Sequence, residues 1–334
     1  MTPRDVSIPN ENNFCGGSFP DWLEVNLIDK CNGKCSWCIE KSGYHPKTHL
    51  PWKKIVGEII KTGKKNIILL GGEPTLFKDL RLLIDLLNDF DKNVYLTTNG
   101  SLLSPDYVRK NFTNLHALNI SIHHYDSARN LQIIGLLIDY NLIKDSITEL
   151  HKNNVSVRLN CNCISGEIDS EEEIFKYIRF AKTVGADKVR FAELKDDKSN
   201  FVDLAMIMKY EYGLNDDPFL LGCNKDVVIN GMPVNFRQMC GLQTDLKKKP
   251  INPKQIVKKV LYYDGKLYDG WQRTFPKENT MNEKDLEILL SGVESGDVPV
   301  SEAMRLIFSE MKKMREISQE IIRKTHLSSG GCQY

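Results

Sequence analysis

Three cysteines near the start of the chain have a spacing that could support metal chemistry. Cys31, Cys35 and Cys38 lie in the run CNGKCSWC, with the spacing Cys-x3-Cys-x2-Cys. Three thiolates on one short loop can bind three corners of an iron–sulfur cubane, which leaves the fourth iron without a protein ligand and open to a small molecule. The spacing therefore predicts an iron–sulfur site, and three structural cysteines brought together by chance are the weakest explanation.

A structural zinc site and a disulfide are the alternatives for this triplet. A structural zinc ion would normally take four ligands, and only His45 and His49 follow nearby, at an unusual spacing. A disulfide would leave one cysteine over and suits a reducing compartment poorly. A non-catalytic zinc protein and an iron–sulfur electron carrier are thus the alternatives to an enzyme, although a carrier normally ligates every iron of its cluster.

Candidate ligand-binding residues follow at the ends of later segments. The run GGEP contains Gly71 and Gly72, which let a backbone approach a ligand closely, and Glu73, whose carboxylate can accept hydrogen bonds from an ammonium group. Thr98 and Asn99, in the run TTNG, could bond a ribose or a carboxylate. Both residues also suit the start of a helix, so the two interpretations stand side by side.

The run VRLNCNC places polar and sulfur side chains on opposite faces of an expected strand. By alternation, Arg158, Asn160 and Asn162 share one face, whereas Cys161 and Cys163 share the other. The polar face could line a cavity, with Asn160 near a ribose and with Arg158 and Asn162 near the substrate, or it could be a hydrogen-bonded network that supports the fold. The two cysteines are expected to be small buried residues.

Other polar residues on neighbouring strands are further candidates. Ser121 could face the same cavity, and Arg190 could bind a carboxylate or a phosphate. A hydroxyl bonded within the sheet and a simple ion pair account for these two residues equally well. His123 and His124 could transfer protons, but hydrogen-bonded structural histidines are commoner.

Alternating strand-like and helix-like segments must position these residues. Six strands, most of them followed by a helix, predict parallel strands joined by right-handed crossovers, in an open sheet or a partial barrel. The candidates lie near the carboxyl ends of strands, which favours a partial (β/α)6 barrel of the TIM type. The expected strands are 22–28, 66–70, 94–98, 118–122, 155–163 and 188–193, and the expected helices are 53–61, 80–90, 105–110, 143–152 and 171–183.

The pattern changes after residue 195. Asn230-Gly231 and Asp264-Gly265 are two-residue hairpin signals between short strand-like runs, and 283–325 has helical periodicity. We therefore expect an irregular lead-in over 1–20, a core barrel over 21–195, and a C-terminal extension of hairpins and helices over 196–334 that covers the substrate.

The composition fits a globular protein. The 334 residues include 41% hydrophobic and 27% charged residues, and the formal net charge is +1, so no overall field indicates nucleic acid or membrane as a partner. No apolar run approaches the roughly 20 residues that span a bilayer, and the N-terminus lacks a secretory pattern. We expect a cytoplasmic location, where clustered cysteines more often bind metal than form disulfides.

The triplet with Trp37 before its last cysteine, followed by GGEP, resembles the radical S-adenosylmethionine (SAM) superfamily. The resemblance implies one [4Fe–4S] cluster on Cys31, Cys35 and Cys38, and SAM bound through its amino and carboxylate groups to the free iron. It implies that the GGEP motif binds the amino group and that Trp37 packs near the adenine. It further implies cleavage of SAM to a 5′-deoxyadenosyl radical, with an electron donor such as flavodoxin or ferredoxin.

From 21 to 195 the order of motifs is most similar to the branch that contains the molybdenum-cofactor GTP cyclase. That resemblance implies a nucleotide or small biosynthetic metabolite as substrate, with a ribosomally made peptide as the alternative. The cyclase has a second cluster on closely spaced C-terminal cysteines, whereas here only Cys223, Cys240 and Cys332 follow the barrel. Cys223 and Cys240 could pack, could join a metal site, or one of them, such as Cys223, could donate a hydrogen atom as in some radical epimerases.

Overall fold

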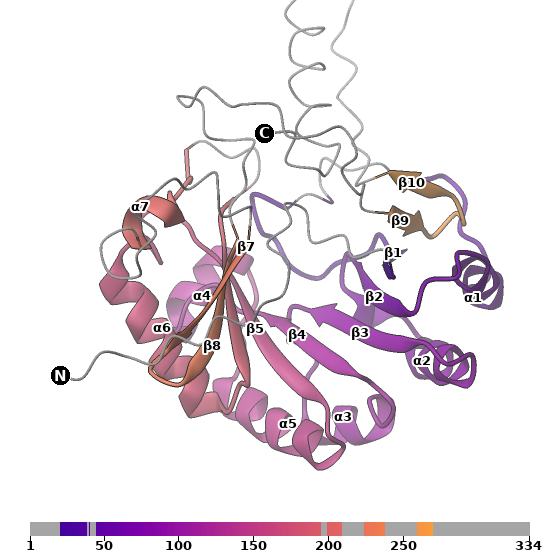
Figure 1. Ribbon diagram of the computed structural model, residues 1–334, viewed down its shortest axis with the longest axis horizontal. Helices are drawn as coiled ribbons and strands as arrows, with labels where there is room; N and C mark the ends of the chain where they lie inside the picture. Colours follow the sequence, from indigo (N-terminus) through magenta and orange to yellow (C-terminus); the bar gives the residue numbers. More distant parts are fainter. Residues whose placement is uncertain are drawn as a thin grey trace, which may run out of the picture.

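The computed structural model describes residues 21–38, 40, 45–194, 199–208, 224–237 and 259–269. Across these residues, ten strands form one curved sheet in the order β10-β9-β1-β2-β3-β4-β5-β6-β8-β7 (Figure 1). The strands are β1 Trp22–Ile28, β2 Asn66–Gly71, β3 Asn93–Thr98, β4 Ala117–Ser121, β5 Ser156–Asn162, β6 Lys188–Ala192, β7 Asn224–Ile229, β8 Met232–Arg237, β9 Lys259–Tyr262 and β10 Leu267–Asp269. The helices are α1 Trp52–Lys61, a 3-10 turn η2 Pro74–Leu76, α2 Leu80–Asp89, α3 Pro105–Asn111, α4 Ser127–Ile134, α5 Tyr140–Lys152, α6 Glu171–Val184 and α7 Leu204–Met208.

The six strands β1 to β6 lie side by side in chain order and are all parallel. Helices α1, α2, α3, α5 and α6 cover the outer side of the curve (Figure 1). The alternating burial along β3 and β5 follows from this arrangement, because every second residue packs under the helices and the others face the inner side. The expected partial TIM-like barrel is confirmed.

Two hairpins extend this sheet at opposite ends. Strand β8 pairs in parallel with β6, and β9 pairs in parallel with β1, so β7 and β10 are the outermost described strands. These hairpins therefore continue the sheet of the barrel. The expected division into a core over 21–195 and a covering region after it stays a prediction, and the expected helices over 283–325 lie outside the described residues.

The turns of the two hairpins differ. Ile229 pairs with Met232 across Asn230 and Gly231, which have φ of 50° and 76°, as the predicted two-residue turn requires. In the second hairpin the amide of Tyr262 donates to the carbonyl of Lys266. The loop there holds three residues, so the prediction of a two-residue turn was wrong, because Gly265 takes the left-handed position of a longer loop.

One helix of the barrel was not expected from the sequence. Helix α4 begins after Asp126, whose carboxylate accepts hydrogen bonds from the amides of Ala128 and Arg129, and it ends at Gly135 in the left-handed conformation. This helix matters for the site because its last carbonyl contacts the cysteine loop. Among the described helices, none is long and apolar enough to cross a bilayer.

Candidate active site

The cysteine loop follows β1 and is fastened to neighbouring elements by hydrogen bonds. Asn32 accepts a hydrogen bond from the side-chain amide of Asn99 at 2.8 Å and donates one to the hydroxyl of Ser101 at 2.9 Å. The amide of Lys34 donates to the carbonyl of Ile134, the last residue of α4, at 2.7 Å. The loop is thus held from one side by the end of β3 and from the other by α4.

Two further contacts fix the far end of the loop. The Trp37 ring meets the His123 ring edge-on, with the ring centroids 5.4 Å apart. The side chain of Asn26, which is buried in β1, donates to the carboxylate of Glu40 at 3.0 Å. Burial raises the pKa of Glu40 to about 7. The segment that carries the three thiols is therefore anchored at its start, middle and end.

The three thiols of this loop are reduced and at least partly accessible. Cys31 is exposed, and Cys35 and Cys38 are half-buried. The amide of Gly33 donates to the sulfur of Cys31 at 3.3 Å. Burial raises the pKa of Cys31, and the negative charges of Glu73 and Cys38 act in the same direction, while the hydrogen bonds from Gly33 and Asn99 oppose them.

The GGEP turn packs directly against the start of the cysteine loop. The amide of Gly72 donates to the carbonyl of Ile28, and the amide of Glu73 donates to the carbonyl of Lys30. A Cβ atom at Gly72 would lie closer than 3.0 Å to the carbonyl oxygens of Asp29 and Lys30. Glycine is required here because two backbone segments touch. This is a structural reason, and it adds to the predicted reason, which was close approach of the backbone to a ligand.

Glu73 is the centre of a buried hydrogen-bond network. Its Oε1 accepts from the amide of Thr75 at 3.0 Å and from the hydroxyls of Thr75 and Thr98, each at 2.6 Å. Its Oε2 accepts from the amide of Asn99 at 2.7 Å. The side chain is 1% exposed. The carboxylate therefore joins the end of β2 to the end of β3.

Thr98 and Asn99 are committed to the same network. The hydroxyl of Thr98 donates to Glu73 and accepts from the amide of Gly100 at 3.1 Å. Asn99 donates to Asn32 and accepts from the amide of Ser101 at 2.9 Å. Both residues have a bracing role that the sequence did not reveal, and their contact with a ribose or a carboxylate stays a prediction.

His123 is buried at the end of β4. Its Nδ1 accepts from the amide of Asn162 at 3.0 Å, so the neutral ring carries its proton on Nε2. Burial lowers the pKa of His123 to about 4. The ring is thus uncharged near neutrality, which favours the structural alternative over proton transfer.

The inner face of β5 and β6 is polar, as the alternation predicted. The Nε of Arg158 donates to Asn160 at 3.0 Å, and Asn160 is the register partner of both Ser121 and Arg190. On the opposite face, Cys161 is fully buried, as expected. Cys163 is also fully buried, and Asn162 ends β5 half-buried.

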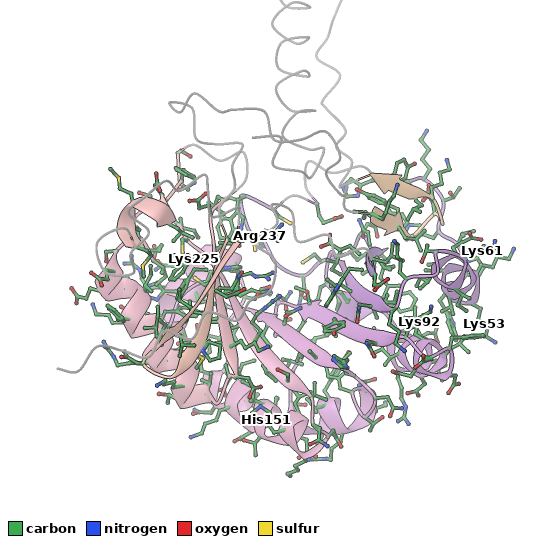
Figure 2. All side chains as sticks on the ribbon, viewed as in Figure 1. Lys53, Lys61, Lys92, His151, Lys225 and Arg237 are labelled. Carbon is green, nitrogen blue, oxygen red and sulfur yellow. The ribbon has the colours of Figure 1, made fainter. Side chains whose placement is uncertain are left out.

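The first hairpin adds residues to this polar face that the sequence did not single out. The Nε of Arg190 donates to the side chain of Asn235 on β8 at 2.8 Å, and Asn235 in turn donates to Asp226 on β7 at 2.8 Å. Arg237, two residues after Asn235, lies at the end of β8 toward the middle of the molecule (Figure 2). Cys223, Cys240 and Cys332 lie outside the described residues, and their roles stay predictions.

Residues 25–178 match the family model described as the Radical SAM superfamily. The chain carries a radical SAM domain. This domain contains the cysteine loop, the GGEP turn and the polar inner strands up to β5, so the predicted resemblance is confirmed.

Known relatives are similar over part of their length. GTP 3′,8-cyclase of Aquifex aeolicus is 27% identical over 183 residues, which cover 52% of this chain and 56% of the relative. The same enzyme of Campylobacter jejuni subsp. jejuni is 30% identical over 187 residues, covering 53% and 57%. An S-adenosylmethionine-dependent nucleotide dehydratase of Lacinutrix mariniflava is 25% identical over 207 residues, covering 57% and 42%. The chain spans about half the length of the curated relatives it matches.

Solved structures share the fold of the radical SAM domain at low identity. Streptococcus suis SuiB bound to S-adenosylmethionine superposes with a TM-score of 0.53 at 18% identity, covering 78% of this chain and 65% of SuiB. The protein anSMEcpe, bound to AdoMet and a Cp18Cys peptide, gives 0.51 at 15% identity, covering 80% and 81%. These likenesses support the barrel architecture.

The family implies a [4Fe–4S] cluster and SAM, and the donor set of the loop fits the cluster. Three reduced thiols lie on one anchored segment, and thiolate is the usual protein ligand of iron–sulfur clusters. Within the described ranges, no group of three His, Cys, Asp or Glu side chains converges as the ligands of a single metal ion. Ligands of a cubane bind different irons, so they need not converge on one point.

Proposed function

We propose that this chain is a radical SAM enzyme in which Cys31, Cys35 and Cys38 hold one [4Fe–4S] cluster. The observation that carries the proposal is the anchored loop of three thiols, packed against a GGEP turn inside a radical SAM domain. When bound, the cluster and SAM supply one-electron cleavage of a sulfonium C–S bond, which gives methionine and a 5′-deoxyadenosyl radical that takes a hydrogen atom from the substrate.

The protein's own residues position this chemistry. Asn99 and Asn32 tie the cysteine loop to β3, and Glu73 holds the ends of β2 and β3 together under it. Because the chain itself donates four hydrogen bonds to the buried Glu73 carboxylate, three of them to Oε1, we propose that the GGEP motif contributes to the SAM site mainly through its backbone. The predicted position of Trp37 beside the adenine stays part of the proposal, with His123 packed against its ring.

We propose a nucleotide or another small biosynthetic metabolite as the substrate. The relatives named GTP 3′,8-cyclase and nucleotide dehydratase support this class, and so does the row of arginine and asparagine side chains on the inner face. Arg158, Asn162 and Arg190 are the residues proposed to contact it or SAM. A ribosomally made peptide is the alternative; the structures bound to peptides are too distant in sequence to bear on this choice.

The remaining partners follow from the reaction class. Cleavage of SAM needs one electron, which a low-potential donor such as flavodoxin or ferredoxin would deliver to the accessible side of the cysteine loop. A cytoplasmic location, without nucleic acid or membrane as partner, is part of the same proposal, because an oxygen-sensitive cluster and free thiols suit a reducing compartment.

Anaerobic reconstitution of Cys35→Ala tests the proposal. We expect the wild-type chain to bind iron and sulfide, to show the visible absorption of a cubane, and to release 5′-deoxyadenosine from SAM when reduced. Cys35→Ala should lose both the cluster and the product. Zinc without iron or sulfide in oxygen-protected wild-type protein would instead support a structural metal site and contradict the proposal.

Cys163→Ala is the matched control. Cys163 is fully buried in the barrel, so this variant removes one thiol from the chain without touching the loop. We expect it to keep the cluster and the release of 5′-deoxyadenosine. Equal loss in both cysteine variants would mean that the loop is not the cluster site.

A further inference from the structure

Four neighbouring strands carry one continuous polar row across the inner face of the sheet. Asn160 on β5 pairs in register with Arg190 on β6, Arg190 with Asn235 on β8, and Asn235 with Asp226 on β7. Hydrogen bonds link Arg190 to Asn235 and Asn235 to Asp226, each at 2.8 Å. Charged and amide side chains at neighbouring positions on the inner face of a sheet need polar partners, because burying them without hydrogen bonds is costly.

Two further arginines flank this row. Arg158 lies two residues before Asn160 on β5, and Arg237 lies two residues after Asn235 on β8, so both share the inner face. The charges of Arg158 and Arg237 both act on Arg190, which places the three guanidinium groups within electrostatic reach of one another. We call Arg158, Arg190 and Arg237 the arginine cluster.

Within the described part of the chain, the arginine cluster carries three positive charges and two carboxylates act on it. These carboxylates are Asp226, which acts on Arg158 and Arg190, and Glu24, which acts on Arg190. Burial, together with repulsion from the other arginines, lowers the pKa of Arg158 to about 10, and it lowers that of Arg190 as well. The arginine ion pairs within 4.0 Å in the described ranges belong to Arg81, Arg109 and Arg129 instead, all at other places.

The orientation of two of these side chains leaves their terminal groups for a ligand. Arg158 and Arg190 each use Nε to donate to an asparagine oxygen, at 3.0 and 2.8 Å. Among the described residues, no hydrogen bond involves the terminal NH2 groups of these two side chains or the guanidinium of Arg237. Asn160, Asn235 and Asp226 therefore act as positioning residues that fix the direction of the guanidinium planes.

We propose that the arginine cluster binds a phosphate group of the substrate. This deepens the proposed function and rests on it, since it assumes that the inner face is the substrate side of the barrel. A phosphate group carries up to two negative charges and offers acceptor oxygens in several directions, which suits several guanidinium groups at once. A single carboxylate, such as that of SAM, offers one charge and one plane, and one arginine suffices for it.

The hairpin β7–β8 thus contributes to the substrate site. Arg237 comes from β8, and both Asn235 and Asp226, which hold Arg190, come from the same hairpin. None of these three residues belongs to the part of the chain that matches the family model. Recognition of the phosphate would therefore be a property of this chain beyond the shared radical SAM domain.

Binding of radiolabelled pyrophosphate by the full, anaerobically reconstituted chain tests the proposal. We expect saturable binding that weakens with rising salt, and a loss of about 10- to 100-fold in affinity in Arg237→Gln, as for the removal of one charged hydrogen-bonding group. Arg179→Gln is the matched control, because Arg179 is exposed on α6 and the change in net charge is the same. This control should bind pyrophosphate like the wild-type chain.

Thermal unfolding gives a second readout that a merely structural arginine would not produce. Without an added anion, Arg237→Gln should raise the melting temperature, because it removes one of three mutually repelling charges. Pyrophosphate should stabilise the wild-type chain more than this variant. A lower melting temperature in Arg237→Gln, with unchanged pyrophosphate affinity, would overturn the proposal.

Two further results separate this inference from the proposed function. SAM affinity is measured in parallel by equilibrium dialysis. A loss of SAM affinity in Arg237→Gln with unchanged pyrophosphate binding would assign the arginine cluster to the cofactor carboxylate and refute a phosphate site. Cys35→Ala should keep pyrophosphate binding while it loses 5′-deoxyadenosine release, so a failure of the radical chemistry would be seen separately from a failure of the anion site.

Discussion

Replacing Glu73 with glutamine tests whether the carboxylate of the GGEP motif is a structural group or a ligand of SAM. In Glu73→Gln the shape is kept and the charge is lost. The oxygen of the amide can still accept the three hydrogen bonds that Oε1 accepts from Thr75 and Thr98. The new NH2 group would then face the amide of Asn99, which is itself a donor.

The expected cost follows from these four bonds. A hydrogen bond to a charged group contributes about 1.5–3 kcal/mol and a neutral one about 0.5–1.5 kcal/mol, so three bonds at the amide oxygen would lose about 1 kcal/mol each. The opposed donors at Asn99 add about 1–3 kcal/mol. Because Glu73 is 1% exposed, the neutral amide regains part of this through its smaller burial penalty. We therefore expect destabilisation of roughly 2–4 kcal/mol, or about 3–6 °C in Tm for a chain of 334 residues.

The assay is thermal unfolding of the cluster-free protein, followed by SAM binding to the reconstituted protein. Glu172→Gln is the control, because its side chain is 77% exposed and, among the described residues, forms its ion pair with Lys176 on the surface of α6. We expect a change of less than about 0.5 kcal/mol there. An unchanged Tm in Glu73→Gln together with weaker SAM binding would refute our reasoning and make the carboxylate a ligand of the SAM ammonium group.

Two further predictions concern the pH dependence and the packing of the site. Since the pKa of His123 is lowered to about 4, the unfolded state binds more protons than the folded one between about pH 4 and 6.5, and up to roughly 3 kcal/mol of stability is lost as pH falls through this window. His123→Asn keeps an acceptor for the amide of Asn162 but does not titrate, so its free energy of unfolding in urea should not fall in this pH window. Glu40 contributes in the opposite direction in both proteins, so its contribution cancels when the wild-type chain and the variant are compared. An equal change of the unfolding free energy with pH in the two proteins would contradict the lowered pKa of His123. Gly72→Ala should destabilise the protein by about 3 kcal/mol or more, because its Cβ would overlap the backbone of the cysteine loop. Gly57→Ala, in open space on α1, should instead stabilise it by about 0.5–1 kcal/mol, and a similar effect of both substitutions in chemical denaturation would show that the overlap is not rigid.

The elements of the barrel could be predicted from the sequence because local patterns determine them. The predicted ends of strands β1 to β6 lie within two residues of the observed ends, since each strand is a short apolar run between turn signals. Helix α4 was missed although its signals were present, with Asp126 as N-cap and Gly135 after its end. Its short length and weak apolar spacing explain why periodicity alone did not reveal it.

Pairing between distant segments could not be predicted in the same way. The turn at Asn230-Gly231 was evident, but nothing local indicates that β8 lies beside β6 or that β9 lies beside β1. Arg237 was therefore not identified as a candidate from the sequence. Whether its side chain faces the inside of the barrel is known only once β8 is placed beside β6. The misjudged turn of the second hairpin has a similar cause: the dipeptide Asp264-Gly265 is compatible with both two- and three-residue loops.

The candidate residues fall into two groups, which differ in whether the protein itself supplies the partners of their polar atoms. The sequence correctly placed polar residues at the carboxyl ends of β2 and β3, but residue types cannot say whether a carboxylate faces a ligand or the protein. The structure places Glu73 inward, against four donors. Arg158 and Arg190, by contrast, form with Arg237 a group of three guanidinium charges, on which two carboxylates of the described residues act, Asp226 and Glu24.

This contrast suggests how one domain can separate cofactor chemistry from substrate choice. The chain itself donates the four hydrogen bonds that the Glu73 carboxylate accepts. Substitutions there should therefore affect the cysteine loop whatever the substrate is. Around Arg190 the orientation depends on Asn235 and Asp226, which belong to the hairpin β7–β8; among the described strands this hairpin lies at the edge of the sheet and pairs with the barrel through β6. An edge hairpin can change without disturbing the packing of β1 to β5, so we expect differences in substrate among similar proteins to lie there, while the loop and its braces stay the same.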